Sequence, residues 1–163
     1  NDCIAMTMAY INIGSNQGDR KAHIDRAVAL ISVLAGSNLR CSDYFESKPW
    51  GYDSTSPYLN LGVAFPTTIP PEELLDRLLA IQNSISPQSH RDAAGNYIDR
   101  IIDIDLIAMD SLVINTPRLT LPHPRMHLRD FVLIPMSQLA PDWLHPLLHL
   151  TPSQLLDNCA RFS

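Results

Sequence analysis

Two aspartates one residue apart are the first candidates for chemistry in this sequence. Asp103 and Asp105 lie in the stretch "DRIIDIDLIAMD", whose apolar residues over 101–108 predict a β-strand. Alternate residues of a strand face the same side, so the two carboxylates project together, about 6.6–6.8 Å apart along the strand. Such a pair suits a divalent cation that substrate phosphates also bind, and it equally suits salt bridges with basic residues such as Arg100. The spacing alone leaves both interpretations open.

A basic segment without acids follows the aspartate pair. No Asp or Glu occurs between Ser111 and Arg129. Carboxylates beside cationic groups are what a metal-bound polyphosphate requires, whereas a solvated basic loop is the alternative interpretation. The basic and histidine side chains of the segment are Arg118, His123, Arg125, His127 and Arg129.

Length and composition indicate one globular domain over residues 1–163. The chain carries a net charge of -5, which disfavours binding to nucleic acids and to acidic membranes. No apolar run approaches the roughly 20 residues that span a bilayer, and the first residues do not resemble a signal peptide. An odd number of widely spaced cysteines favours a reducing cytoplasm over a disulfide framework or a zinc site. These cysteines are Cys3, Cys41 and Cys159.

The order of predicted elements favours an α+β fold. Residues 5–13, 39–47, 58–65 and 101–108 read as strands, and helices are expected after Asp19 and after Pro70. This β-α-β-β-α-β order is typical of the ferredoxin-like sandwich, an antiparallel sheet with helices on one face. A short strand over 112–115 is expected to return as a hairpin. Two short helices, over 130–138 and 152–158, form a C-terminal extension.

Four segments carry a resemblance to a known family. They are "AYINIGSNQGD", "SKPWGYDSTSPYLN", "DRIIDIDLI" and "INTPRLTLPHPRMHLRDFVLIPMSQLAPD", and the last is long and irregular. Over essentially its whole length, the chain resembles the 6-hydroxymethyl-7,8-dihydropterin pyrophosphokinases of folate biosynthesis. The resemblance implies a cytoplasmic monomer that transfers the terminal diphosphate of ATP to the hydroxymethyl group of the pterin and releases AMP. It also implies two magnesium ions.

The resemblance assigns roles to individual residues. Asp103 and Asp105 are expected to hold the metal ions. The expected catalytic residues are Arg100, Asp103, Asp105, His123 and Arg129. Tyr58 and Phe131 are expected to stack on the pterin and Asn60 to bind its edge, and the other pterin-binding residues are Ser47, Lys48 and Trp50. The expected nucleotide-binding residues are Arg91, Leu106, Arg118, Thr120, His123 and Arg129.

The sequence departs from the family on the ATP side. The family has an arginine-rich cluster in the loop before the acidic strand, where this chain has His90 and Arg91. The family also has a Gln and a Glu on the upstream helix, where this chain has Leu79 and Gln82. We therefore expect near-normal pterin binding and weaker ATP binding than is usual for the family.

Three other functions remain open at this point. The chain could be a catalytically weakened paralogue that binds pterin and nucleotide. It could be a two-metal nucleotidyltransferase or phosphodiesterase, which would leave Tyr58, Asn60 and Phe131 without a role. It could also be a metal-free binding domain in which Asp103 and Asp105 form ion pairs with basic residues.

Overall fold

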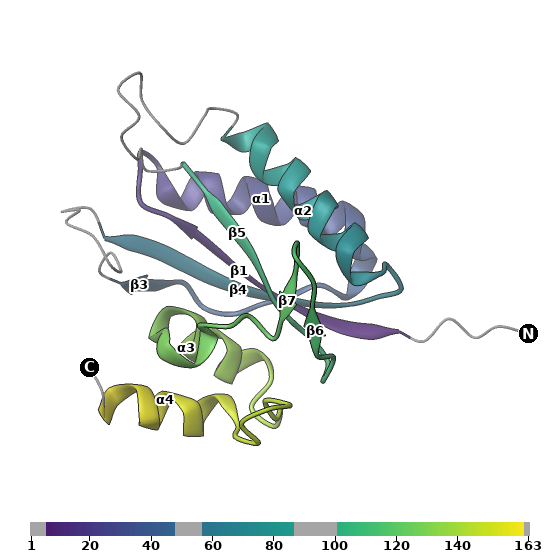
Figure 1. Cartoon of the computed structure of the whole chain (residues 1–163). Coiled ribbons are helices and arrows are strands. Elements are labelled where there is room, and N and C mark those ends of the chain that lie inside the picture. Colours follow the sequence, from purple (N-terminus) through teal and green to yellow (C-terminus); the bar gives the residue numbers. More distant parts are fainter. Residues whose placement is uncertain (1–5, 48–56, 87–100, 162–163) are drawn as a thin grey trace, which may run out of the picture.

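The computed structural model describes residues 6–47, 57–86 and 101–161 (Figure 1). No helix in these ranges is both long enough and apolar enough to cross a bilayer. The predicted β-α-β-β-α-β order is confirmed. The elements are β1 (Thr7–Ser15), α1 (Arg20–Ala35), β2 (Arg40–Cys41), β3 (Phe45–Ser47), β4 (Tyr58–Thr67), α2 (Pro71–Ile85), β5 (Asp103–Met109), β6 (Ile114–Asn115), β7 (Thr120–Leu121), α3 (Asp130–Leu139) and α4 (Pro152–Arg161), with 3-10 turns at Gly36–Asn38 and Met126–Leu128.

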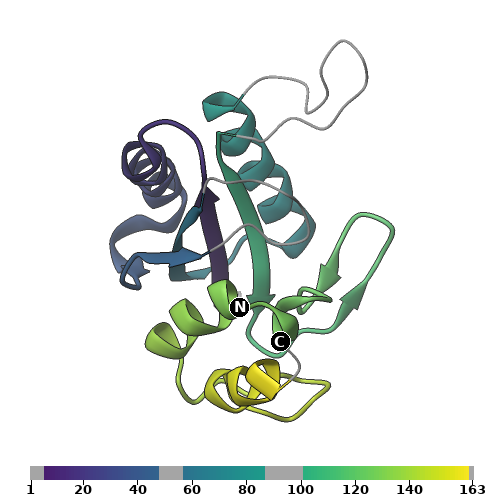
Figure 2. The same ribbon diagram turned by 90° about the vertical axis from the view of Figure 1, so that its left-hand side faces the viewer.

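The main sheet is antiparallel with the strand order β2-β4-β1-β5, and β3 also pairs with β4. The connection through α2 leaves one strand, β1, between β4 and β5, which is the topology expected of a ferredoxin-like fold. Helices α1 and α2 cover one face of the sheet, as predicted. Helix α3 of the C-terminal extension packs on the other face, with α4 beyond it (Figures 1 and 2).

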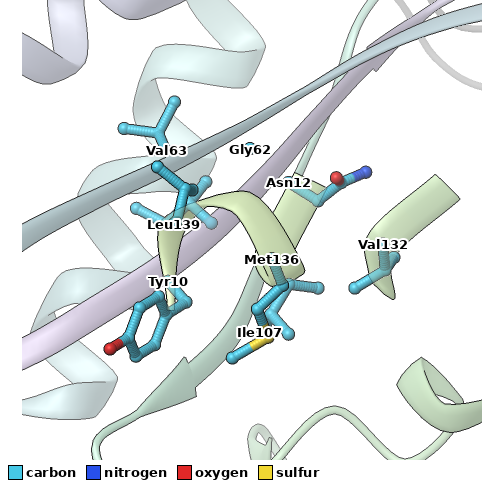
Figure 3. Close-up of a pocket in the computed structure, with 9 residues that line it drawn as sticks. Tyr10, Asn12, Gly62, Val63, Ile107, Val132, Met136 and Leu139 are labelled. Carbon is cyan, nitrogen blue, oxygen red and sulfur yellow. The ribbon is translucent and has the colours of Figure 1, made fainter. Parts of the chain in front are cut away.

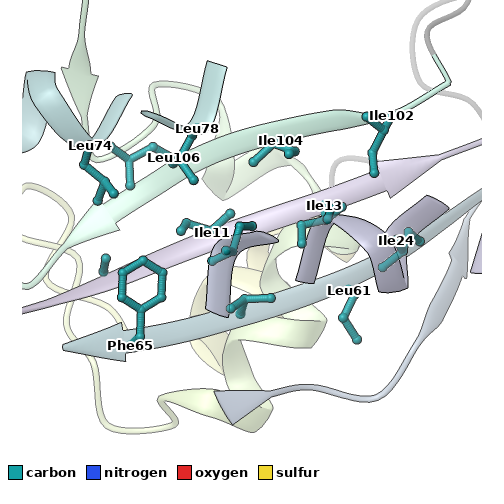
Figure 4. Packing of buried hydrophobic residues seen from close by; sticks show 14 of the residues in the cluster. Ile11, Ile13, Ile24, Leu61, Phe65, Leu74, Leu78, Ile102, Ile104 and Leu106 are labelled. Carbon is teal, nitrogen blue, oxygen red and sulfur yellow. The ribbon is translucent and has the colours of Figure 1, made fainter. Parts of the chain in front are cut away.

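Side-chain alternation on the strands creates two cores. Ile11 and Ile13 of β1 face α1 and α2 and join the larger cluster, together with Phe65, Leu74 and Ile104 (Figure 4). Tyr10 of β1 and Ile107 of β5 belong to the second cluster, where they pack with Val132, Leu133 and Met136 of α3. The sheet is therefore covered on both faces, and the residues that face α3 include the candidate site.

Local sequence signals begin and end the two long helices. The carboxylate of Asp19 accepts a hydrogen bond from the Ala22 backbone N–H at 3.1 Å and caps α1, which ends at Gly36 with φ 73°. Helix α2 begins with Pro71, followed by Glu72 and Glu73 in its first turn, where acidic side chains interact favourably with the helix dipole.

Two predictions about the strands are wrong. The strand expected over 39–47 is two short strands, because Ser42 interrupts it: its hydroxyl accepts from the Gly62 N–H at 2.8 Å, and its N–H donates to the Gly62 carbonyl at 2.9 Å. The segment expected to form a hairpin with β5 instead contains β6, which pairs with β7 in a separate two-stranded sheet. The first difference arises from a contact between residues 20 apart in the sequence, whereas the second arises from a local pairing of Ile114 with Leu121 and of Asn115 with Thr120.

Close packing of α3 against β4 generates a test of the fold. A Cβ atom at Gly62 would lie 2.8 Å from Pro135 Cβ and 3.1 Å from Leu139 Cδ1. We expect Gly62→Ala to lower the free energy of unfolding by about 1–3 kcal/mol, because the helix must shift to admit the methyl group. Urea denaturation measures this loss. Thr68→Ala, at an exposed position just after β4, should change stability by less than about 0.5 kcal/mol. Equal midpoints for Gly62→Ala and the unsubstituted chain would contradict the prediction.

Candidate active site

Strand β5 presents the two aspartates on one side, as the alternation predicts. Asp103 and Asp105 are partly exposed, whereas Ile104 and Leu106 between and beside them are buried in the larger core. Asp103 pairs with Gly14 of β1, and Asp105 pairs with Asn12. Both carboxylates therefore share the face of the sheet that α3 covers.

Buried polar side chains fix the backbone where β5 begins. Ser15 donates its hydroxyl to the Ile101 carbonyl at 2.6 Å, and Ser86 accepts from the Ile101 N–H at 3.3 Å. The Gln82 carboxamide oxygen accepts from the Ile104 N–H at 2.9 Å. Because hydrogen bonds from β1 and from α2 and its C-terminal end both hold this segment, the backbone that carries the two aspartates is fixed in position. No local sequence pattern indicates these roles, since each depends on contacts between distant segments.

A pocket of about 300 Å³ lies beside Asp105 and brings together five residues that we predicted: Asp105, Leu106, Arg118, Thr120 and His123. Sequence reasoning missed its other wall, which includes Leu75 of α2 and Pro124. Leu79 and Gln82, the two departures on α2, also line it. Gln82 already uses its oxygen on the β5 backbone. The two departures thus line the pocket that holds the residues predicted to bind the nucleotide.

Arg118 reaches this pocket from the segment between β6 and β7. Its guanidinium donates to the carboxylate of Asp76 on α2, in an exposed ion pair. Exposed pairs of this kind contribute little to stability, so a polyphosphate can compete for the guanidinium. Thr120, two residues further on, is exposed at the same pocket.

His123 is partly buried between the pocket and two arginines. Its backbone N–H donates to the Ile107 carbonyl at 2.7 Å, which ties it to β5, and its Nδ1 accepts from the Arg125 N–H at 3.1 Å. Burial, together with the positive charges of Arg129 and Arg125, lowers the pKa of His123 to about 4. The imidazole is therefore neutral at pH 7, with Nε2 left as the donor.

Arg129 lies between the aspartates and the aromatic residue that follows it. Burial lowers the pKa of its guanidinium, and the negative charges of Asp105 and Asp103 oppose that shift. Its Cζ is 5.6 Å from the centroid of the Phe131 ring, a cation–π arrangement. The structure thus brings Arg129, Phe131 and the carboxylates into one neighbourhood.

Three of the residues predicted to bind the pterin, Ser47, Tyr58 and Asn60, gather across Gly14. Asn60 is buried, and its Nδ2 donates to the Ser47 hydroxyl at 2.8 Å and to the Phe45 carbonyl at 3.3 Å. A Cβ at Gly14 would lie 3.0 Å from Asn60 Oδ1 and 3.5 Å from Tyr58 Cδ1. Because Gly14 also pairs with Asp103, the Asn60 cluster adjoins the aspartates across a single strand.

Arg20, at the start of α1, joins the two chain segments that carry this cluster. Its Nη1 donates to the Pro57 carbonyl at 3.0 Å, and its Nη2 donates to Glu46 Oε2 at 2.8 Å. Glu46 and Pro57 immediately precede Ser47 and Tyr58, which pair at the end of the β3–β4 ladder. One guanidinium therefore holds the end of this ladder in place. Sequence reasoning did not identify this residue.

Four of the predicted site residues fall beyond the part of the chain that the structure describes. They are Lys48, Trp50, Arg91 and Arg100. Among the residues that are described, no group of three or more His, Cys, Asp and Glu side chains is arranged to hold a metal ion. The two carboxylates of β5 suit magnesium, which binds one or two carboxylates and takes its remaining ligands from phosphates and water.

Comparisons with known proteins point to one family. The model of one protein family, described as 7,8-dihydro-6-hydroxymethylpterin-pyrophosphokinase (HPPK), matches residues 10–141. A 2-amino-4-hydroxy-6-hydroxymethyldihydropteridine pyrophosphokinase of Porphyromonas gingivalis is 37% identical over 142 residues, which cover 86% of this chain and 95% of the relative. The enzyme of the same name from Bacillus subtilis is 35% identical over 133 residues, covering 81% of this chain and 77% of the relative.

A solved structure agrees in fold. The wild-type HPPK-DHPS of Plasmodium falciparum with pteroate aligns with a TM-score of 0.73 at 14% identity, over 94% of this chain. This chain spans only 42% of that longer protein. At such low identity the likeness supports the α+β fold alone. Taken with the match over 10–141 and the relatives at 37% and 35% identity, the chain belongs to the HPPK family, the pyrophosphokinases of folate biosynthesis.

Proposed function

We propose that this pyrophosphokinase acts at the site around Asp103 and Asp105, moving the terminal diphosphate of ATP onto 6-hydroxymethyl-7,8-dihydropterin. The hydroxymethyl oxygen attacks the β-phosphorus, the bond from that phosphorus to the α-phosphate bridging oxygen breaks, and AMP leaves. The hydroxyl proton passes to solvent. One observation carries the proposal: β5 presents both carboxylates between the pocket with His123 and the Asn60 cluster.

The pocket beside Asp105 would bind ATP in this proposal. Thr120 and Leu106 line it near the expected position of the adenosine, and Arg118 and Arg91 are proposed to contact the nucleotide. The neutral His123 can donate from Nε2 to a phosphate oxygen, and Arg129 can offset negative charge that develops on the diphosphate. Phosphoryl transfer requires mainly alignment and charge stabilisation from a protein, which these groups supply.

The carboxylates of Asp103 and Asp105 would hold two magnesium ions as part of this proposal. The donor set fits, because magnesium accepts two carboxylates and completes its coordination with phosphate oxygens. Bound magnesium supplies charge neutralisation on the phosphates. Arg100, which precedes the strand, and Arg129 would add positive charge at the same place.

The cluster across Gly14 would bind the pterin in this proposal. Tyr58 and Phe131 would stack on the two faces of the ring, each contact worth about 0.5–1.5 kcal/mol beyond burial. The Nδ2 of Asn60 donates its hydrogen bonds to Phe45 and Ser47 of β3, so its Oδ1 is available to accept from the amino edge of the pterin. Ser47, Lys48 and Trp50 are proposed to complete the pterin site.

A weakened family member is the second candidate, and Leu79 and Gln82 favour it. Leu79 offers the nucleotide pocket no polar group, and Gln82 is already bonded to the β5 backbone. We expect pterin affinity to be usual for the family and ATP affinity to be lower. We further propose a cytoplasmic monomer, because Cys41 and Cys159 are free thiols in the described part of the chain, as a reducing compartment allows.

One coupled assay tests the function directly. The chain is incubated with ATP and magnesium, with and without the hydroxymethyl dihydropterin, and AMP release is followed. We expect AMP only when the pterin is present. AMP or pyrophosphate release without pterin would favour a nucleotidyltransferase or phosphodiesterase, and no release with intact nucleotide binding would favour the weakened paralogue.

Replacing either carboxylate tests the metal assignment. Asp103→Asn and Asp105→Asn keep the shape of the side chain and remove its charge, so we expect turnover to fall on the order of 100-fold or more. Turnover is measured as AMP release at saturating substrates. Asp110→Asn, just after the same strand, is the matched control and should keep near-normal turnover. If Asp103→Asn lowered stability without changing magnesium-dependent nucleotide binding, the pair would be a structural ion-pair group.

The His123 imidazole should take up a proton when nucleotide binds. Its pKa is about 4 in the free protein, and the negative triphosphate should raise it. Between the His123 pKa of the free protein and that of the nucleotide-bound protein, the bound protein carries the proton in a larger fraction of molecules. Nucleotide affinity should therefore rise as the pH falls through that window. NMR titration of the imidazole, with and without a nonhydrolysable ATP analogue, measures both values. His123→Asn assigns the signal, and an unchanged pKa on binding would remove His123 from the phosphate site.

The contacts of Arg20 predict a selective effect on the pterin. Arg20→Ala frees Glu46 and the Pro57 carbonyl and loosens the end of the β3–β4 ladder, so the KM for pterin should rise about fivefold. The KM for ATP should stay unchanged. Lys21→Ala removes the neighbouring cation, which pairs with Asp25 on the same helix, and should leave both constants unchanged. Equal increases in both constants for Arg20→Ala would indicate general destabilisation instead.

A further inference from the structure

Asn12 is a buried amide in the middle of β1 that no part of the predicted site includes. It is 4% exposed, between Ile11 and Ile13, and its Oδ1 accepts no hydrogen bond from any described residue. Asn is depleted in strands, and a buried acceptor without a donor destabilises the folded state. A side chain of this kind at a buried position therefore calls for a functional explanation.

The surroundings of Asn12 on the α3 side are apolar. Asn12 borders a cavity of about 10 Å³ whose lining includes Val132, Met136 and Ile107. Figure 3 shows the carboxamide pointing away from Tyr10 and Leu139. A cavity this small and apolar does not supply the two to four polar partners that a stable water needs. A partner for the oxygen therefore has to come from another direction.

The strand register identifies that direction. Asn12 pairs with Gly62 on β4 and with Asp105 on β5. Gly62 has no side chain, whereas Asp105 carries a carboxylate on the same face of the sheet. Directly opposed residues of an antiparallel pair have Cβ atoms about 4.5–5.5 Å apart, a separation that polar ends can bridge directly or through a water.

We infer that Asn12 is a positioning residue for the Asp105 carboxylate, acting through one water molecule between them. Both Oδ1 of Asn12 and the carboxylate are acceptors, and a water has two O–H donors with which to join them. This contact would fix one carboxylate oxygen and orient the other to bind magnesium. Hydrogen-bonded partners of metal-binding carboxylates commonly act in this way. The inference rests on the proposed function of Asp105.

The first test replaces Asn12 by leucine, which keeps the shape and removes both polar atoms. The free protein should become more stable, with a melting temperature about 2–4 °C higher, because the unbonded acceptor is gone. Manganese affinity in the presence of a nonhydrolysable ATP analogue should fall about tenfold, as measured by electron paramagnetic resonance. A purely structural residue would not give opposite signs in these two measurements. Met136→Leu, at the same cavity, is the control and should leave manganese affinity unchanged.

A second pair of variants covers the case in which leucine does not fit. Asn12→Ser retains a hydroxyl that can hold the water, and Asn12→Ala differs from it by that single oxygen. Manganese should bind about tenfold more weakly to the alanine variant and within about threefold of normal to the serine variant. Equal affinities for the two variants, or a loss of pterin affinity alone, would overturn the role of Asn12. Failure of the unsubstituted chain to bind manganese with nucleotide would instead overturn the proposed function.

Discussion

The pairing of β1 with both of its neighbours is the constraint on which the site depends. Its register places Asn60, Gly14 and Asp103 in one row across the sheet, and Gly62, Asn12 and Asp105 in the next. A shift of one residue would turn every one of these side chains to the opposite face. The buried Ile11 and Ile13 of the same strand prevent such a shift, because they are locked into the core beneath α1 and α2. Hydrophobic packing on one face thus fixes the polar geometry on the other.

The electrostatics of the site follow from partial burial of cations in an acidic chain. The net charge of -5 would repel a polyphosphate at long range, so attraction has to be local. In the proposed function Arg129 would provide it, beside two carboxylates whose negative charges oppose the lowering of its pKa by burial. His123 stays neutral because the same arginine and the desolvated surroundings disfavour a second positive charge. In the proposed function, the partly buried guanidinium of Arg129 would bind phosphate, and the neutral His123 would become charged when phosphate binds.

Much of this arrangement could be predicted from short-range signals in the sequence. Alternation along β5 predicted the shared face of Asp103 and Asp105, and the Asp19 cap and the proline pair Pro70–Pro71 predicted where two helices begin. Contacts between distant segments could not be predicted in this way. The bonds from Ser15 and Gln82 to the start of β5 join segments 86 and 22 residues apart, and no local pattern distinguishes these side chains from ordinary surface residues.

Two glycines of the sheet, Gly14 and Gly62, allow close approaches that a side chain would prevent. A Cβ at Gly14 would lie 3.0 Å from Asn60 Oδ1, so the missing side chain lets the Asn60 amide lie close to β1. At Gly62, one row away, the missing side chain instead lets Pro135 and Leu139 of α3 lie close to β4. Asn12 lies at the boundary between these two places, beside α3 and directly opposite Asp105. A buried amide at that boundary lowers stability, and such a local conflict is expected at a position where function, rather than packing, determines the residue.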